Sequence, residues 1–141
     1  EIATLVTDAQ LNILAEGPSI AVHQTDDVLD NMNEWCIEQH GKSGLTQRVR
    51  ESAISMAQAE QATIAFLSEW VDEGASPICG NSVSQDRRFL FKYMHRFSAF
   101  FTIVPLTLAP LKSLLAAGTP KHLVALLSLA RTWQWTILKT R

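Results

Sequence analysis

The chain has 141 residues, a formal net charge of −2 and two cysteines, Cys36 and Cys79. This length fits one domain with a hydrophobic core and is too short to expect two. The nearly balanced net charge gives no overall electrostatic signature of a protein that binds long nucleic acids. The cysteines form neither a disulfide framework nor a zinc-ligand spacing, so we interpret them as reduced core thiols of a cytoplasmic protein. No signal peptide is present, and the start at Glu1 without a Met suggests that an N-terminal segment is missing.

The first half of the chain predicts a β-hairpin followed by helices. Two apolar, β-branched runs joined by a short polar link are typical of paired strands: Glu1–Asp8 and Asn12–His23. Helical patterns follow, separated by the break GKSG, over Asp26–Trp35 and Leu45–Ser52. The clearest helix begins at Ser55, which forms a capping-box pattern with Gln58. Apolar residues then recur at helical spacing: Ala59, Ala62, Phe66 and Trp70.

The segment 77–94, PICGNSVSQDRRFLFKYM, is the most informative part of the sequence. It predicts a short strand over Ile78–Asn81 and then a helix. Asp86 lies in the first turn of that helix, where the helix dipole favours an acidic side chain. An apolar face follows at Phe89, Leu90 and Tyr93. The resulting order, β-β-α-α-β-α, predicts an α/β or α+β layered fold.

Taken whole, this segment resembles the second exonuclease motif of the oligoribonuclease family, whose members are 3′-to-5′ exoribonucleases of the DEDDh group. The in-frame resemblance covers Glu1–Met94. It implies an α/β, ribonuclease H-like exonuclease fold, in which helices flank a mixed sheet. It also implies two-metal hydrolysis with Mg²⁺ or Mn²⁺, a short single-stranded RNA with a free 3′ end as substrate, and a cytoplasmic homodimer without membrane association. In that family the Asp at the position of Asp86 is a metal ligand, and the alternative is an acid that only stabilises the helix start.

Three further residues are candidates for substrate contacts through the same resemblance. Trp35, in EWCIEQHGKSGL, resembles the aromatic residue that stacks on the terminal base, and stacking contributes about 1–3 kcal/mol per base. His40 and Ser82 resemble contacts to the 5′ phosphate of the substrate. The alternatives are an ordinary core Trp for Trp35 and surface loop residues for the other two. A basic helix face is interpreted as solvated and receives no function: Arg87, Arg88 and Lys92.

The sequence changes character after Met94, and no Asp or Glu occurs from His95 to Arg141. We interpret this tail as translated from a shifted reading frame. If one nucleotide is lost near His95, each true codon consists of the last base of one codon and the first two bases of the next. The codons of Trp133 and Gln134 then must encode Ala at their junction, and those of Trp135 and Thr136 must encode Asp. The shifted frame there allows GTHLAMDDI, which resembles the family's third motif with its catalytic His and last Asp. Earlier in the tail, at 101–113, it allows HYRTIDVSTIKE, which resembles the family's segment after the second motif.

The predicted organisation is therefore a partial exonuclease domain at 1–94 and an out-of-frame, poorly ordered tail at 95–141. The catalytic set is incomplete, because only Asp86 remains and the family's opening Asp-x-Glu does not occur in the chain. Two-metal hydrolysis requires several carboxylates that hold two cations about 4 Å apart. We thus predict a chain that is inactive as written and does not bind the metals. One alternative is a non-catalytic remnant that at most binds a nucleotide or a partner chain. Another is a DNA-proofreading relative of the same exonuclease group, and the sequence GNSVSQDRRFLFKYM argues against it.

Overall fold

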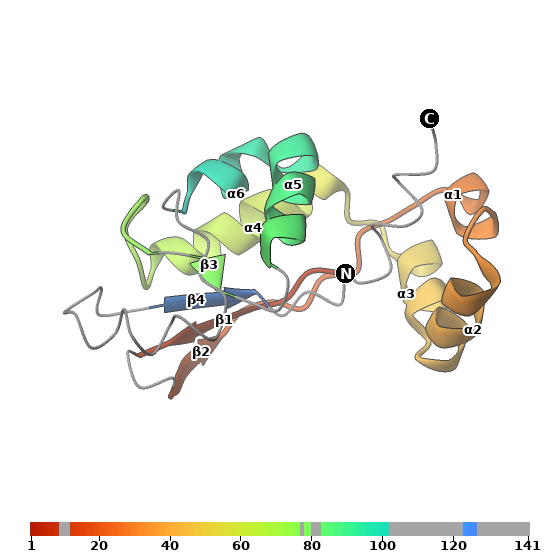
Figure 1. Cartoon of the computed structure of the whole chain (residues 1–141), viewed down its shortest axis with the longest axis horizontal. Helices are drawn as coiled ribbons and strands as arrows, with labels where there is room; N and C mark the ends of the chain where they lie inside the picture. The colour runs from red at the N-terminus through yellow and green to blue at the C-terminus, as the bar shows by residue number, and fades with distance from the viewer. Residues whose placement is uncertain (9–11, 77, 80–82, 102–122, 127–141) are drawn as a thin grey trace.

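A mixed β-sheet with helices on one side forms the larger part of the molecule in the computed structural model (Figure 1). The structure describes residues 1–8, 12–76, 78–79, 83–101 and 123–126. The strands are β1 (Thr4–Thr7), β2 (Ile13–Glu16), β3 (Ile78–Cys79) and β4 (Leu123–Leu126). The helices are α1 (Asp26–Asp30), α2 (Glu34–Lys42), α3 (Leu45–Glu51), α4 (Met56–Ser68), α5 (Val83–Tyr93) and α6 (His95–Ala99). Within the described ranges, no helix has the length and apolar character needed to cross a membrane.

The strand order across the sheet is β2-β1-β4-β3. The predicted hairpin is confirmed, because β1 pairs antiparallel with β2, with Val6 opposite Ala15. The second strand is shorter than the predicted run Asn12–His23: after Glu16 only a single bridge, between Ile2 and Ile20, continues the pairing. Strand β4 lies between β1 and β3, antiparallel to β1 and parallel to β3. A segment far along the chain thus forms one of the two central strands of the sheet.

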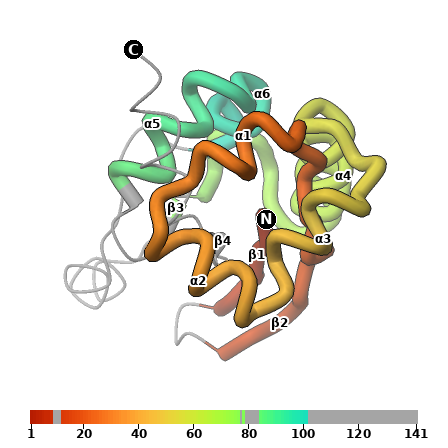
Figure 2. Tube along the Cα trace, turned by 90° about the vertical axis from the view of Figure 1, so that its right-hand side faces the viewer, coloured from red at the N-terminus to blue at the C-terminus, as the bar shows by residue number. Residues whose placement is uncertain are grey.

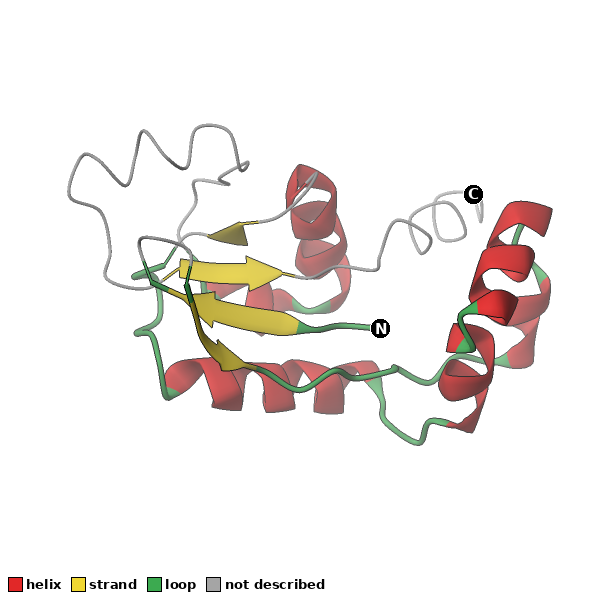
Figure 3. Ribbon diagram, turned by 90° about the horizontal axis from the view of Figure 1, so that it is seen from below, coloured by secondary structure: helices red, strands yellow, loops and turns green. Residues whose placement is uncertain are grey.

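Helices α4, α5 and α6 lie together on one side of the sheet, as Figures 1 and 3 show from two directions. Val6 from β1 and Ile78 from β3 are fully buried against this helical layer. The capping box predicted at Ser55 is confirmed: the Ser55 hydroxyl accepts from the Gln58 amide, and the Gln58 side chain accepts from the Ser55 amide. The remaining core members are Ile20, Val22, Ala59, Leu67, Val71, Leu90, Met94, Phe97, Phe100 and Phe101.

Helices α1, α2 and α3 form a second group at the other end of the molecule (Figures 1 and 2). Their small core consists of Leu29, Leu45 and Val49. The prediction of one helix over Asp26–Trp35 is wrong, because α1 ends at Asp30 and α2 begins at Glu34. Asn33 causes the break: its backbone is extended, and its side chain accepts a hydrogen bond from the Cys36 amide at 2.8 Å. Asn competes for backbone hydrogen bonds inside a helix and is favoured as an N-cap.

The first residues after Met94 are helical and packed. Phe97 on α6 is fully buried, and its amide donates to the Glu60 carboxylate on α4 at 2.9 Å. The carbonyl of Phe100 accepts from the Gly74 amide at 2.9 Å. Residues 95–101 therefore pack with the core. The division between a domain at 1–94 and a tail at 95–141 stays a prediction. The rest of the tail, apart from β4, lies outside the described residues.

Candidate functional site

Asp86 lies in the first turn of α5, the helix that follows β3 along the chain. Its side chain is half-buried. The apolar face predicted for this helix is confirmed, because Leu90 is buried and the rings of Phe89 and Tyr93 pack with centroids 4.9 Å apart. This packing fixes α5 against the core. Asp86 is therefore held on a rigid element at the point where the chain leaves the sheet.

Among the residues that the structure describes, no group around Asp86 forms a two-metal centre. In the described part of the chain, no three or more His, Cys, Asp or Glu side chains come together in a way that could hold a metal ion. Two-metal chemistry needs several carboxylates that share the charge of two cations. The described residues around Asp86 thus do not by themselves form the donor set of such a centre.

Trp35 is exposed to solvent on α2, with 59% of its surface accessible. The alternative interpretation as an ordinary core Trp is therefore wrong. The Asn33 cap sets where α2 begins, and it places Trp35 in the first turn, while Cys36 beside it points inward and is buried. The predicted core position of Cys36 is confirmed by this burial, whereas the side chain of Cys79 is not among those that the structure describes. An exposed indole in this position can stack on a flat ring without any change of the core.

His40 lies near the end of α2 and is half-buried. Burial lowers the pKa of His40, because it disfavours the charged imidazolium, and the positive N-terminal amine of Glu1 lowers it further. The same N-terminal residue is tied to α3, since the Glu1 carboxylate and the Arg48 guanidinium form an ion pair at 3.2 Å. His40 is consequently a neutral hydrogen-bonding group at neutral pH, and it is not the surface loop residue of the alternative interpretation.

The three predicted site residues that the structure describes, Asp86, Trp35 and His40, are not gathered at one place. Trp35 and His40 share α2, but their separation of five positions puts them about 140° apart around the helix axis. Helix α2 belongs to the group of helices at the other end of the molecule from α5, the helix that carries Asp86 (Figure 1). Ser82 lies outside the described residues, so its predicted role stays a prediction.

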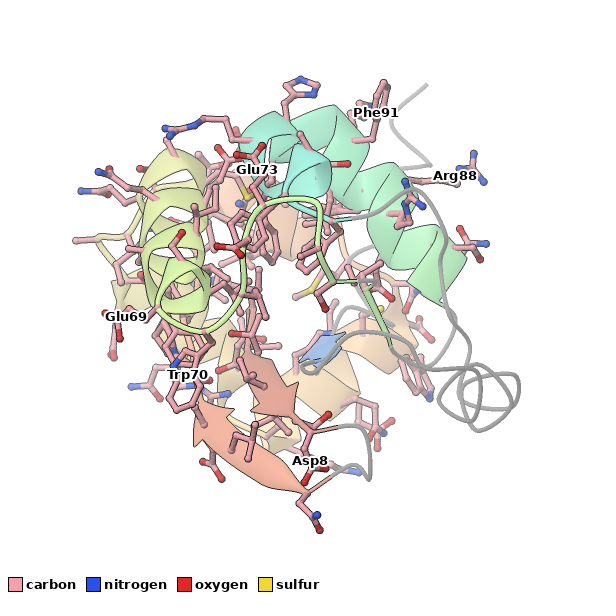
Figure 4. All side chains as sticks on the ribbon, turned by 90° about the vertical axis from the view of Figure 1, so that its left-hand side faces the viewer. Asp8, Glu69, Trp70, Glu73, Arg88 and Phe91 are labelled. Atoms are coloured by element: carbon pink, nitrogen blue, oxygen red, sulfur yellow. The ribbon has the colours of Figure 1, made fainter. Side chains whose placement is uncertain are left out.

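The sequence reasoning gave no function to the other face of α5. Phe91 is 71% exposed there, and Arg88 and Lys92 are exposed on the same stripe. In Figure 4, Arg88 and Phe91 project from α5 away from the core. The spacing of three and four positions was a visible signal of a shared face. The exposure of Phe91 could not be predicted from the sequence. Two other aromatic residues of the same helix, Phe89 and Tyr93, are half-buried.

Comparison with known proteins decides the family. A family model described as "RNase_T: Exonuclease" matches residues 1–130. The oligoribonuclease of Pseudomonas fluorescens is 58% identical over 120 residues, which are 85% of this chain and 67% of that protein. The chain belongs to the oligoribonuclease family of exonucleases.

Other relatives agree with this assignment. The oligoribonuclease of Colwellia psychrerythraea is 55% identical over 123 residues, covering 87% of this chain and 68% of that protein. The oligoribonuclease of Pseudomonas aeruginosa is 55% identical over 121 residues, covering 86% of this chain and 67% of its own length. The predicted α/β, ribonuclease H-like exonuclease fold is thereby confirmed, in an incomplete form. Exonucleases of this family in general depend on divalent metal ions.

Proposed function

We propose that the chain derives from a 3′-to-5′ exoribonuclease that degrades short RNA to mononucleotides, and that these 141 residues do not carry out the hydrolysis. Membership of the family and the names of the relatives support the first part. The position of Asp86, half-buried in the first turn of a packed helix after β3, carries the assignment of the active site. The absence of a convergent acidic group among the described residues supports the second part.

The topology also suggests where the missing carboxylates would enter. Asp86 follows β3, so acidic side chains on another strand reach it only if that strand lies next to β3. In this chain β4 takes that position, and its pairing to β3 is parallel. We infer that the tail segment Leu123–Leu126 occupies the place that the family's Asp-x-Glu strand requires. In the complete family protein these carboxylates would hold Mg²⁺ or Mn²⁺, and the protein would be a cytoplasmic homodimer.

The substrate contacts proposed for this chain need no metal. Trp35 offers an exposed indole for the terminal base, and stacking on it contributes about 1–3 kcal/mol. His40, neutral at pH 7, donates one hydrogen bond to a terminal phosphate, and Ser82 adds a hydroxyl contact. The partner proposed is a short single-stranded RNA with a free 3′ end. The exposure of Trp35 favours a second candidate function as well, a non-catalytic remnant that binds a nucleotide.

The catalytic proposal is tested by hydrolysis of a 5′-labelled short RNA in Mg²⁺ or Mn²⁺. The chain of 141 residues is expected to release no nucleotides. A chain extended by an Asp-x-Glu strand before Glu1, and read in the alternative frame after Met94, is expected to hydrolyse the RNA. Asp86→Ala in that extended chain should reduce hydrolysis to background, because one lost ligand disturbs the charge and geometry of both metals. Asp72→Ala, which removes an exposed acid near the end of α4, is the control and should keep the activity.

Two outcomes would overturn this proposal. Metal-dependent hydrolysis by the 141-residue chain would show that it holds a complete site. An extended chain that is active but indifferent to Asp86→Ala would remove Asp86 from the site.

Nucleotide binding is tested separately on the 141-residue chain by titration with a dinucleotide in EDTA. Trp35→Ala should weaken binding at least about fivefold, the lower end of what one stacked base contributes. Trp70→Ala is the matched control, because Trp70 is also an exposed Trp, at the end of α4, with 36% of its surface accessible. Equal losses in both variants, or none in Trp35→Ala, would contradict the role of Trp35.

A further inference from the structure

Helix α5 carries a basic and aromatic face that the proposed active site does not use. Arg88, Phe91 and Lys92 are separated by three and four positions, so they lie along one stripe of the helix. His95, the first residue of α6, continues the stripe, because its ring meets the Phe91 ring edge-on with centroids 5.9 Å apart. We name these four residues the α5 stripe. Figure 4 shows Arg88 and Phe91 pointing outward from the molecule.

The α5 stripe is open to solvent. All four of its residues are exposed. Phe91, at 71%, is more exposed than any other large hydrophobic side chain that the structure describes. Neither Arg88 nor Lys92 forms an ion pair with a residue in the described ranges. Lys92 lies over the Tyr93 ring, with its Nζ 5.1 Å from the centroid, which leaves its ammonium group near the aromatic surface.

The charged residues along the sequence of the α5 stripe have a single sign. From Arg87 to Arg96 the sequence contains four Lys or Arg residues and no Asp or Glu. Trp70 has the opposite surroundings, because it follows Glu69 and precedes Asp72 and Glu73. Figure 4 shows Glu69 and Trp70 on a different part of the surface from Arg88 and Phe91. Phe91 is thus an exposed aromatic side chain in a basic setting, and the ligand it fits is an anion with a flat ring.

We propose that the α5 stripe binds single-stranded RNA, with a base stacked on Phe91 and the neighbouring phosphates paired with Arg88 and Lys92. Cationic side chains that follow the backbone, combined with an aromatic platform for the bases, are the physical basis of single-strand binding. The stripe has only one exposed apolar side chain. It therefore lacks the apolar core that a stable protein interface has. For the same reason it lacks the apolar surface of a helix that inserts into a membrane.

The α5 stripe lies on the side of the helix opposite Asp86. Asp86 is separated from Phe91 by five positions and from Arg88 by two, which places it about 140° and 200° away around the axis. An RNA strand bound on the stripe consequently does not need to reach Asp86. The surface binds RNA without metal and without hydrolysis, so it goes beyond the proposed catalytic function.

The test measures binding of a fluorescein-labelled single-stranded RNA of twelve uridines to the 141-residue chain in EDTA, by fluorescence anisotropy. Phe91→Ala should weaken binding at least about fivefold, as expected for the loss of one stacked base. The double variant Arg88→Gln, Lys92→Gln should weaken binding and also reduce the slope of log affinity against log salt by about 1.4, because each lost phosphate contact contributes about 0.7 for a single strand. Circular dichroism checks that each variant is folded.

Three controls make the outcome specific. Trp70→Ala removes an exposed aromatic side chain in an acidic setting and should leave RNA affinity unchanged. Asp72→Ala removes an exposed acid that lies neither on the α5 stripe nor in the proposed active site, and it should also leave the affinity unchanged. An abasic oligomer of the same length should bind more weakly than the RNA and should lose no further affinity with Phe91→Ala.

The proposal is overturned if Phe91→Ala weakens RNA and abasic oligomer equally, because the ring then does not stack on a base. It is also overturned if polyglutamate displaces the RNA as effectively as unlabelled RNA does, because the stripe would then be a site for acidic proteins. A folded double variant with unchanged affinity and salt slope would remove Arg88 and Lys92 from the binding surface.

Discussion

His40 illustrates how a single position couples the packing of α2 to pH. Burial first, and the N-terminal amine of Glu1 second, lower the pKa of His40 below its ordinary value of about 6.5. The unfolded chain therefore takes up this proton more readily than the folded chain does. The contribution of His40 to stability is fully present above about pH 6.5 and is lost as the pH falls through the lowered pKa.

We expect His40→Gln to reduce the loss of stability between pH 7 and pH 5, because glutamine has no proton to gain in that range. The measurement is the urea midpoint of unfolding at a series of pH values. Gln39→Ala is the control, since Gln39 is an exposed neighbour on α2 that carries no titratable group, and its replacement should leave the pH profile unchanged. A His40→Gln profile as steep as that of the original chain would contradict this linkage.

At the scale of single elements, α2 depends on its first hydrogen bond. The Asn33 side chain accepts from the Cys36 amide and separates α2 from α1. Asn33→Ala should lower the free energy of unfolding by about 1 kcal/mol, the typical contribution of an N-cap. Asn33→Asp keeps an acceptor and adds a favourable charge at the helix start, so it should retain the stability. Urea unfolding of both variants tests this, and equal midpoints for the two would show that the cap does not stabilise α2.

The elements that could be predicted from sequence are those that local interactions determine. The capping box at Ser55 and the apolar face of α5 depend on residues three or four positions apart, and both were predicted correctly. The break at Asn33 was missed because the apolar spacing through Trp35 continues across it. Strand β4 could not be predicted, because its partners lie in β1 and β3. For the candidate site, the position of Asp86 followed from the sequence, whereas the exposure of Trp35 and Phe91 required the packed structure.

At the scale of the whole molecule, two parts of the tail belong to the same layered structure. Strand β4 joins β1 to β3 across the centre of the sheet. Helix α6 places Phe97 against α4, and the Phe97 and Phe101 rings pack with centroids 5.0 Å apart. A boundary of the folded domain at Met94 would make all of these residues dispensable. In the structure, by contrast, residues 95–101 pack in the core. Their contribution to the free energy of unfolding can be measured by substitution.

Phe97→Ala should therefore lower the free energy of unfolding by about 3–5 kcal/mol, because it removes a fully buried ring and leaves a cavity. A small domain has only about 5–15 kcal/mol of stability, so the variant should be partly unfolded at moderate temperature. Phe91→Ala is the matched control from α5: its ring is 71% exposed, and its loss should change stability by less than about 0.5 kcal/mol. Urea unfolding compares the two variants. An unchanged midpoint for Phe97→Ala would instead place the end of the packed domain at Met94, as the change of composition in the sequence predicts.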